Sequence, residues 1–79
     1  MEQIFSTKDL KLASVLITLG FHYEPRRQGP VWYFSFPNAD LNTLDETIDK
    51  YFQKGLLVDP RILFDNYEIL KTRVKEGIG

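Results

Sequence analysis

The sequence predicts a small α+β protein of 79 residues, in which an antiparallel hairpin packs with three amphipathic helices in the order β-α-β-β-α-(β)-α. Three observations predict this class: a capped helical pattern near the N-terminus, an aromatic segment with a period of two after Gly20, and two further helical patterns. A chain of this length holds one core, so residues 1–79 are expected to form a single domain.

The first segment, FSTKDLKLASVLITLGF, follows a short strand that we expect near Ile4. Ser6 is expected to cap the helix, with Asp9 in the capping-box position and Phe5 stapled against Leu10. The polar residues of this segment, which fall on one narrow stripe, are Lys8, Lys11, Ser14 and Thr18. Most of the helix is therefore predicted to be buried, with Ser14 on its surface. Gly20 then supplies a left-handed residue at the helix end, and Phe21 folds back after it.

The next segment alternates with a period of two, which is typical of a hairpin. A turn over RRQG, with Pro25 facing Pro30, would set its register. The predicted pairs are Tyr23 with Trp32 and Phe21 with Phe34 on one face, and His22 with Tyr33 and Glu24 with Val31 on the other. Because the first face is uniformly aromatic, we assign it to the core and expect Trp32 to point inward.

Two more helical patterns follow. In DLNTLDETIDKYFQKG the cap is open among Asp40, Asn42 and Thr43. The apolar stripe predicted for this helix consists of Leu41, Leu44, Ile48, Tyr51 and Phe52. The segment LLVDPRILFDNYEILKTRVKEG begins with an apolar run that leaves a strand at residues 56–58 open, and then Asp59 caps a helix with Pro60 in its first position. Gly77 is expected to end that helix. The predicted core consists of Phe5, Leu10, Leu16, Phe21, Trp32, Phe34, Ile48, Phe52, Leu63, Tyr67 and Leu70.

The second face of the sheet has two alternatives. If the last helix crosses it, His22, Val31 and Tyr33 are buried. If the last helix packs elsewhere, these three residues form an exposed patch that suits a protein partner.

The start FSTKDL, the strand VWYFSF and the turn VDPR before the last helix together resemble a family of short bacterial and phage proteins, grouped as a domain of unknown function. Phe5 to Leu10 and Val58 to Arg61 carry the two motifs. The resemblance spans nearly the whole chain. It implies a small, non-secreted protein of a kind often linked with phage or mobile-element genes, and it implies no activity.

Catalytic and metal chemistry has little support in the sequence. His22 is the only histidine and there is no cysteine, whereas a zinc site normally needs three or four closely spaced ligands. A serine nucleophile would have His22 as its sole candidate base. The glycines occur singly, which is unlike a loop that cradles phosphate. We therefore predict a non-enzyme without metal or cofactor.

Charge and hydropathy narrow the choice of partners. The formal net charge is −1, from 10 basic and 11 acidic residues, which gives no overall attraction to nucleic acid or to an anionic membrane. Arg26 and Arg27 at the hairpin tip resemble the wing of DNA-binding domains, and Lys8 and Lys11 are further candidates, although so few phosphate contacts would bind weakly. The apolar runs are shorter than the roughly 18 residues that a membrane span needs. The N-terminus is acidic and has no signal-peptide pattern, so we expect a cytoplasmic protein.

We therefore predict a non-catalytic protein-interaction module, which acts as a homodimer or as an adaptor or inhibitor of a larger protein. Nucleic-acid binding through the hairpin tip is the alternative.

Overall fold

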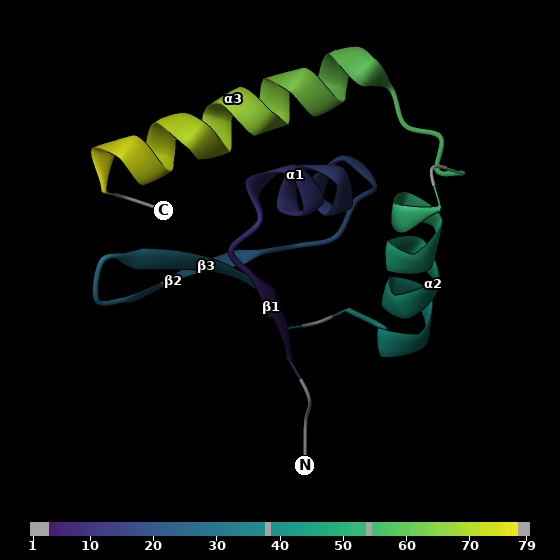
Figure 1. The fold of residues 1–79 in the computed structure, drawn as a ribbon, viewed down its shortest axis with the longest axis horizontal. Coiled ribbons are helices and arrows are strands. Elements are labelled where there is room, and N and C mark those ends of the chain that lie inside the picture. Colours follow the sequence, from purple (N-terminus) through teal and green to yellow (C-terminus); the bar gives the residue numbers. More distant parts are fainter. Residues whose placement is uncertain (1–3, 38, 54, 78–79) are drawn as a thin grey trace.

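The computed structural model of the protein describes residues 4–37, 39–53 and 55–77. Its elements are, in order, β1 (Phe5–Thr7), α1 (Leu10–Thr18), β2 (Glu24–Gln28), β3 (Val31–Phe36), α2 (Leu41–Phe52) and α3 (Pro60–Glu76). The predicted α+β class, the hairpin and the three helices are confirmed. Figure 1 shows α1 between the sheet and α3, with α2 standing at one end of the molecule.

The sheet has three antiparallel strands in the order β1-β3-β2. The strand expected near Ile4 forms one residue later as β1 and joins the sheet, with Phe5 opposite Phe36. Its first expected residues, 2 and 3, lie outside the described residues. The strand left open at residues 56–58 does not form. These residues are irregular chain before α3, and Leu57 is 91% exposed.

The start of α1 differs from its prediction. Asp9, not Ser6, is the N-cap, and its carboxylate accepts hydrogen bonds from the backbone N–H groups of Lys11 (2.9 Å) and Leu12 (3.3 Å). Ser6 lies in β1, where its hydroxyl is 2.9 Å from the Ser35 hydroxyl. Pairing with β3 thus holds Ser6 away from the helix end. The predicted staple of Phe5 on Leu10 is wrong for the same reason, because Phe5 lies four residues before the true cap.

The end of α1 is as predicted. Gly20 has a φ of +100°, a left-handed value that favours glycine. The Gly20 N–H donates to the Ile17 carbonyl and the Phe21 N–H to the Leu16 carbonyl, both at 3.0 Å, which is the reverse turn of a Schellman motif. Phe21 consequently packs against the core from the loop after the helix.

The polar stripe of α1 is only partly open to water, because Lys8 and Lys11 are exposed while Ser14 and Thr18 face α3, so the prediction of a surface Ser14 is wrong. Ser14 is fully buried, and its hydroxyl donates to the Leu10 carbonyl at 2.6 Å. Thr18 donates in the same way to the Ser14 carbonyl at 2.7 Å and accepts a 3.0 Å bond from the Asn66 amide of α3. These bonds satisfy the polar groups at the α1–α3 contact.

The hairpin register also differs. The turn is only Gly29–Pro30, closed by Gln28 opposite Val31, because Gly29 has a φ of +60°, the positive value that the first position of a type II′ turn requires. Arg27, rather than Tyr23, lies opposite Trp32. Because side chains alternate between the two faces of a strand, a shift by four residues, an even number, leaves every side chain on its predicted face. Phe34 and Phe36 of β3 therefore still point toward the core. The predicted pairing of His22 with Tyr33 is lost together with the other pairs.

The core lies between the sheet, α1 and the two later helices. Its fully buried apolar residues are Leu12, Ala13, Val15, Leu16, Phe34, Phe36, Leu44 and Leu70. Of the predicted core, Leu16, Phe34 and Leu70 are confirmed as fully buried. Phe52 is 68% exposed, so its placement in the core was wrong, because the apolar stripe of α2 is wider than the surface that α1 covers. The remaining predicted members are half-buried, including Trp32, whose ring lies under Arg27.

The caps of the later helices follow local rules. Asp40, one of three open candidates, caps α2 and accepts from the Asn42 N–H at 3.0 Å. Asp59 caps α3 with Pro60 in the first turn, as predicted, and Gly77 ends α3 with a φ of +78°. These short signals depend on neighbouring residues only, which is why the sequence predicts them well.

Candidate functional site

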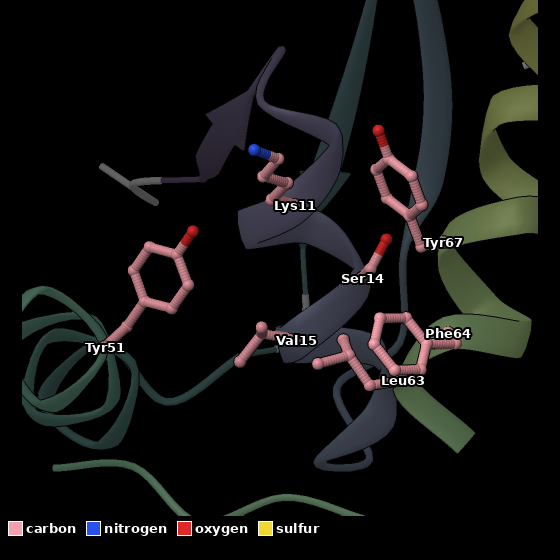
Figure 2. A pocket seen from close by; sticks show the side chains of 7 residues that line it. All are labelled: Lys11, Ser14, Val15, Tyr51, Leu63, Phe64 and Tyr67. Atoms are coloured by element: carbon pink, nitrogen blue, oxygen red, sulfur yellow. The ribbon is translucent and has the colours of Figure 1, made fainter. Parts of the chain in front are cut away.

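A groove of about 290 Å³ opens between α1, α2 and α3 (Figure 2). Its lining residues are Lys11, Ser14, Val15, Tyr51, Leu63, Phe64 and Tyr67. Aromatic and aliphatic side chains form most of its wall, and a few polar groups accompany them. This combination is typical of sites that bind a ligand or a partner's side chain.

Helical spacing brings these side chains together. On α1, Lys11 and Val15 are one turn apart and face the same side. Leu63 and Tyr67 have the same relation on α3, and Tyr51 faces them from the last turn of α2. The site therefore exists only where three helices meet, and the bond from Asn66 to Thr18 beside it ties α3 to α1.

The rim of the groove carries an exposed aromatic side chain. Phe64 is 67% exposed although it lines the groove. Of the seven exposed large apolar side chains in the described part of the chain, four lie between residues 52 and 64: Phe52, Leu57, Ile62 and Phe64. Soluble domains seldom gather exposed apolar groups in one segment unless that segment makes contacts.

The electrostatics of the groove are set by one lysine and two phenols. Among the described residues that line it, Lys11 alone is charged. Burial, and secondarily the nearby Asp9 carboxylate, raise the pKa of Tyr51 above its usual 10.0, so its hydroxyl stays protonated and can donate a hydrogen bond. Beside the groove, the Lys71 ammonium lies 5.6 Å from the centre of the Tyr67 ring.

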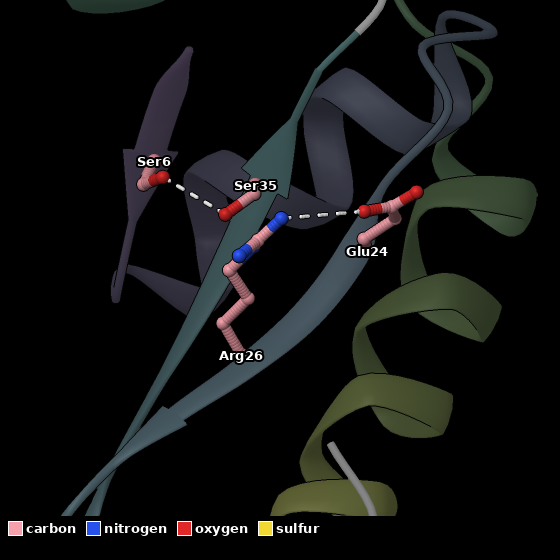
Figure 3. A network of polar contacts seen from close by, with 4 residues as sticks. All are labelled: Ser6, Glu24, Arg26 and Ser35. Atoms are coloured by element: carbon pink, nitrogen blue, oxygen red, sulfur yellow. Dashed lines mark hydrogen bonds and ion pairs between the residues drawn. The ribbon is translucent and has the colours of Figure 1, made fainter.

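The two tip arginines do not form a joint cationic surface. They are neighbours in β2, so their side chains point to opposite faces of the hairpin. Figure 3 shows Arg26 reaching along the sheet to Glu24, with 3.7 Å between the guanidinium and the carboxylate. Arg27 donates to the Gly29 carbonyl at 2.8 Å, and its guanidinium lies 5.7 Å from the Trp32 ring centre. Each arginine thus already has a partner within the hairpin.

The predicted partner-binding residues are only partly brought together. Val31 and Tyr33 are half-buried on the second sheet face, opposite Gln28 and Arg26 respectively. His22 is exposed in the loop between α1 and β2 and is not aligned with Tyr33. Because α3 packs along α1, none of the helices in the described part of the chain crosses this face (Figure 1). The face is nevertheless narrow, and charged side chains of β2 line its edge.

The two lysines named with the arginines lie elsewhere in the fold. Lys8 is exposed in the loop before α1, and Lys11 is exposed in the first turn of α1, where it lines the groove. Lys11 therefore belongs to a different site from the one the sequence suggested.

Neither metal nor membrane chemistry gains support from the arrangement. Among residues 4–37, 39–53 and 55–77, no three His, Asp or Glu side chains are grouped so that they could hold a metal ion. No helix in the same part of the chain has the length and apolar character that crossing a bilayer needs.

Sequence reasoning missed the groove. It assigned Tyr51 and Tyr67 to buried stripes and did not use Phe64 at all. The available signal was Phe64 itself, a large aromatic residue outside the apolar stripe of its own helix. An apolar side chain out of phase with the core is a hint of an external contact.

Comparison with family models, with curated proteins and with solved structures found no match. The resemblance to short bacterial and phage proteins therefore stays a prediction.

Proposed function

We propose that this protein is a non-catalytic protein-interaction module and that the groove between α1, α2 and α3 is its docking site. The observation that carries the proposal is Phe64, which is 67% exposed at the rim of a groove whose wall is mostly apolar. Aromatic side chains at the edge of a concave apolar surface are typical anchors of protein interfaces.

The shape of the groove favours an adaptor or inhibitor over a homodimer. A two-fold dimer places the same patch of both copies face to face. In a dimer each hollow would have to be filled by the Phe64 of the other copy, a side chain that already lines its own groove, whereas a convex side chain of a different protein fills the hollow directly. The second sheet face is a weaker candidate, because Val31 and Tyr33 are half-buried beside the Glu24–Arg26 ion pair.

Nucleic-acid binding through the hairpin tip has less support. Arg26 and Arg27 point to opposite faces, and each contacts a group of its own hairpin. Phosphate binding would have to replace these contacts, and two arginines would release few counterions from DNA.

The test is site-specific photo-crosslinking in cells that produce the protein. In the test variant a benzophenone amino acid replaces Phe64. In the control variant it replaces Ile69, which is 49% exposed on another side of α3. We expect one identified protein to be cross-linked through position 64, not through position 69, and to bind purified wild type but not Phe64→Asp. Equal labelling at both positions, or unchanged binding by Phe64→Asp, would refute the proposal.

A further inference from the structure

The groove has two chemically different ends. Figure 2 shows the Lys11 ammonium and the hydroxyls of Tyr51 and Tyr67 toward one end, and Val15, Leu63 and Phe64 toward the other. The first end presents a cation and two hydroxyls, while the second presents only carbon.

The polar end suits an anion. No carboxylate lies within ion-pair distance of Lys11 in the described part of the chain, and none lines the groove. Asp9 is close enough to influence Tyr51, but its carboxylate accepts two backbone N–H groups as the cap of α1. Lys71 beside Tyr67 adds a second positive charge near the groove, although Glu68 lies 3.4 Å from it.

The size of the groove suits side chains rather than a large ligand. Its volume of about 290 Å³ lies at the bottom of the range of roughly 300–1,000 Å³ that small-molecule pockets span. Lys11 and Val15 are four residues apart on α1, which separates the two ends by about 6 Å along the helix. A partner must therefore present its anion and its apolar anchor about one helical turn apart.

We propose that the groove binds an acidic amphipathic peptide segment of a partner protein. A bulky aliphatic or aromatic side chain of that segment lies between Val15, Leu63 and Phe64. An Asp or Glu within four residues of this anchor pairs with Lys11 and accepts a hydrogen bond from one of the two tyrosine hydroxyls. This inference rests on the proposed function and names the chemistry of the partner. It corresponds to recognition of a helix in a groove, with charge fixing the register.

The experiment is selection of a displayed library of random 12-residue peptides on purified protein. Wild type, Lys11→Glu and Phe64→Asp are used as separate targets, each after circular dichroism has shown a wild-type fold. Ile69→Asp is the matched control for an added charge on α3. Sedimentation of the wild type in the same buffer records its mass.

We expect peptides enriched on wild type and on Ile69→Asp to share a bulky apolar residue with an Asp or Glu within four positions. On Lys11→Glu the acidic preference should disappear or change to Lys and Arg, with at least a tenfold loss of affinity for the wild-type peptides. Apolar enrichment that depends on Phe64 without any acidic preference would overturn the partner chemistry and leave the docking site intact. If no peptide is enriched on wild type relative to Phe64→Asp, both the partner chemistry and the docking site are overturned. A wild-type dimer that Phe64→Asp dissociates would overturn both as well.

Discussion

Leu44 and Phe52 lie on the same helix and were both assigned to its apolar stripe, but the structure gives them opposite environments. Leu44 is fully buried, whereas Phe52 is 68% exposed. Leu44→Ala removes a buried side chain and leaves a cavity, which should lower the free energy of unfolding by about 2–5 kcal/mol. Phe52→Ala should cost at most about 1 kcal/mol, because only about a third of a side-chain transfer energy of roughly 1.5–3 kcal/mol is at stake.

The assay is urea unfolding followed by circular dichroism and by the fluorescence of Trp32. A domain this small has little stability to lose, so Leu44→Val, expected to cost about 1 kcal/mol, serves if the alanine variant does not fold. The order of the two positions decides the question. A larger loss for Phe52→Ala than for Leu44→Ala would show that α2 packs with a different face and would remove the groove.

Three other predictions concern charge and capping. Duplex DNA at low salt should not be retained by the wild type; retention that the double variant Arg26→Ala, Arg27→Ala abolishes would make the hairpin tip a nucleic-acid site. The pKa of Tyr51 is raised in the folded state, so the folded protein holds this proton longer and its stability falls as pH rises above 10.0. Tyr51→Phe should weaken that fall in alkaline urea titrations, and an unchanged slope would contradict the burial of the phenol. Asp9→Ala should cost about 0.5–2 kcal/mol and Asp9→Asn less, because asparagine still caps; equal losses in thermal unfolding would speak against capping by this side chain.

The parts of the fold that follow from neighbouring residues could be predicted. Asp59 with Pro60, Gly20 with its left-handed backbone, and Gly77 act within one or two turns, so their sequence context suffices. The predicted hairpin register was wrong because the segment PRRQGP fits both a four-residue turn over RRQG and a two-residue turn at Gly29–Pro30. The sequence does not show which turn forms, whereas the structure shows it through the positive φ of Gly29. Local patterns specify an element better than they specify its partner.

The candidate site was harder to predict for a related reason. Whether an apolar residue of α2 faces α1 or water depends on the angle at which the helices meet, and periodicity within one helix does not contain that angle. The sequence pattern indicates Lys11 only as a surface charge and Ser6 only as a cap. Their real surroundings, a groove and a strand, come from residues far away in the sequence.

The hydrogen bond from Asn66 to Thr18 has a consequence for binding. A slide of α3 along α1 by one turn would move the amide by about 5.4 Å and leave the 3.0 Å bond broken. Leu63 and Tyr67, which flank Asn66, are therefore held in register with Lys11 and Val15 before any partner arrives. Such preorganisation lowers the entropic cost of association, so even a short peptide segment can bind without first ordering the surface that receives it.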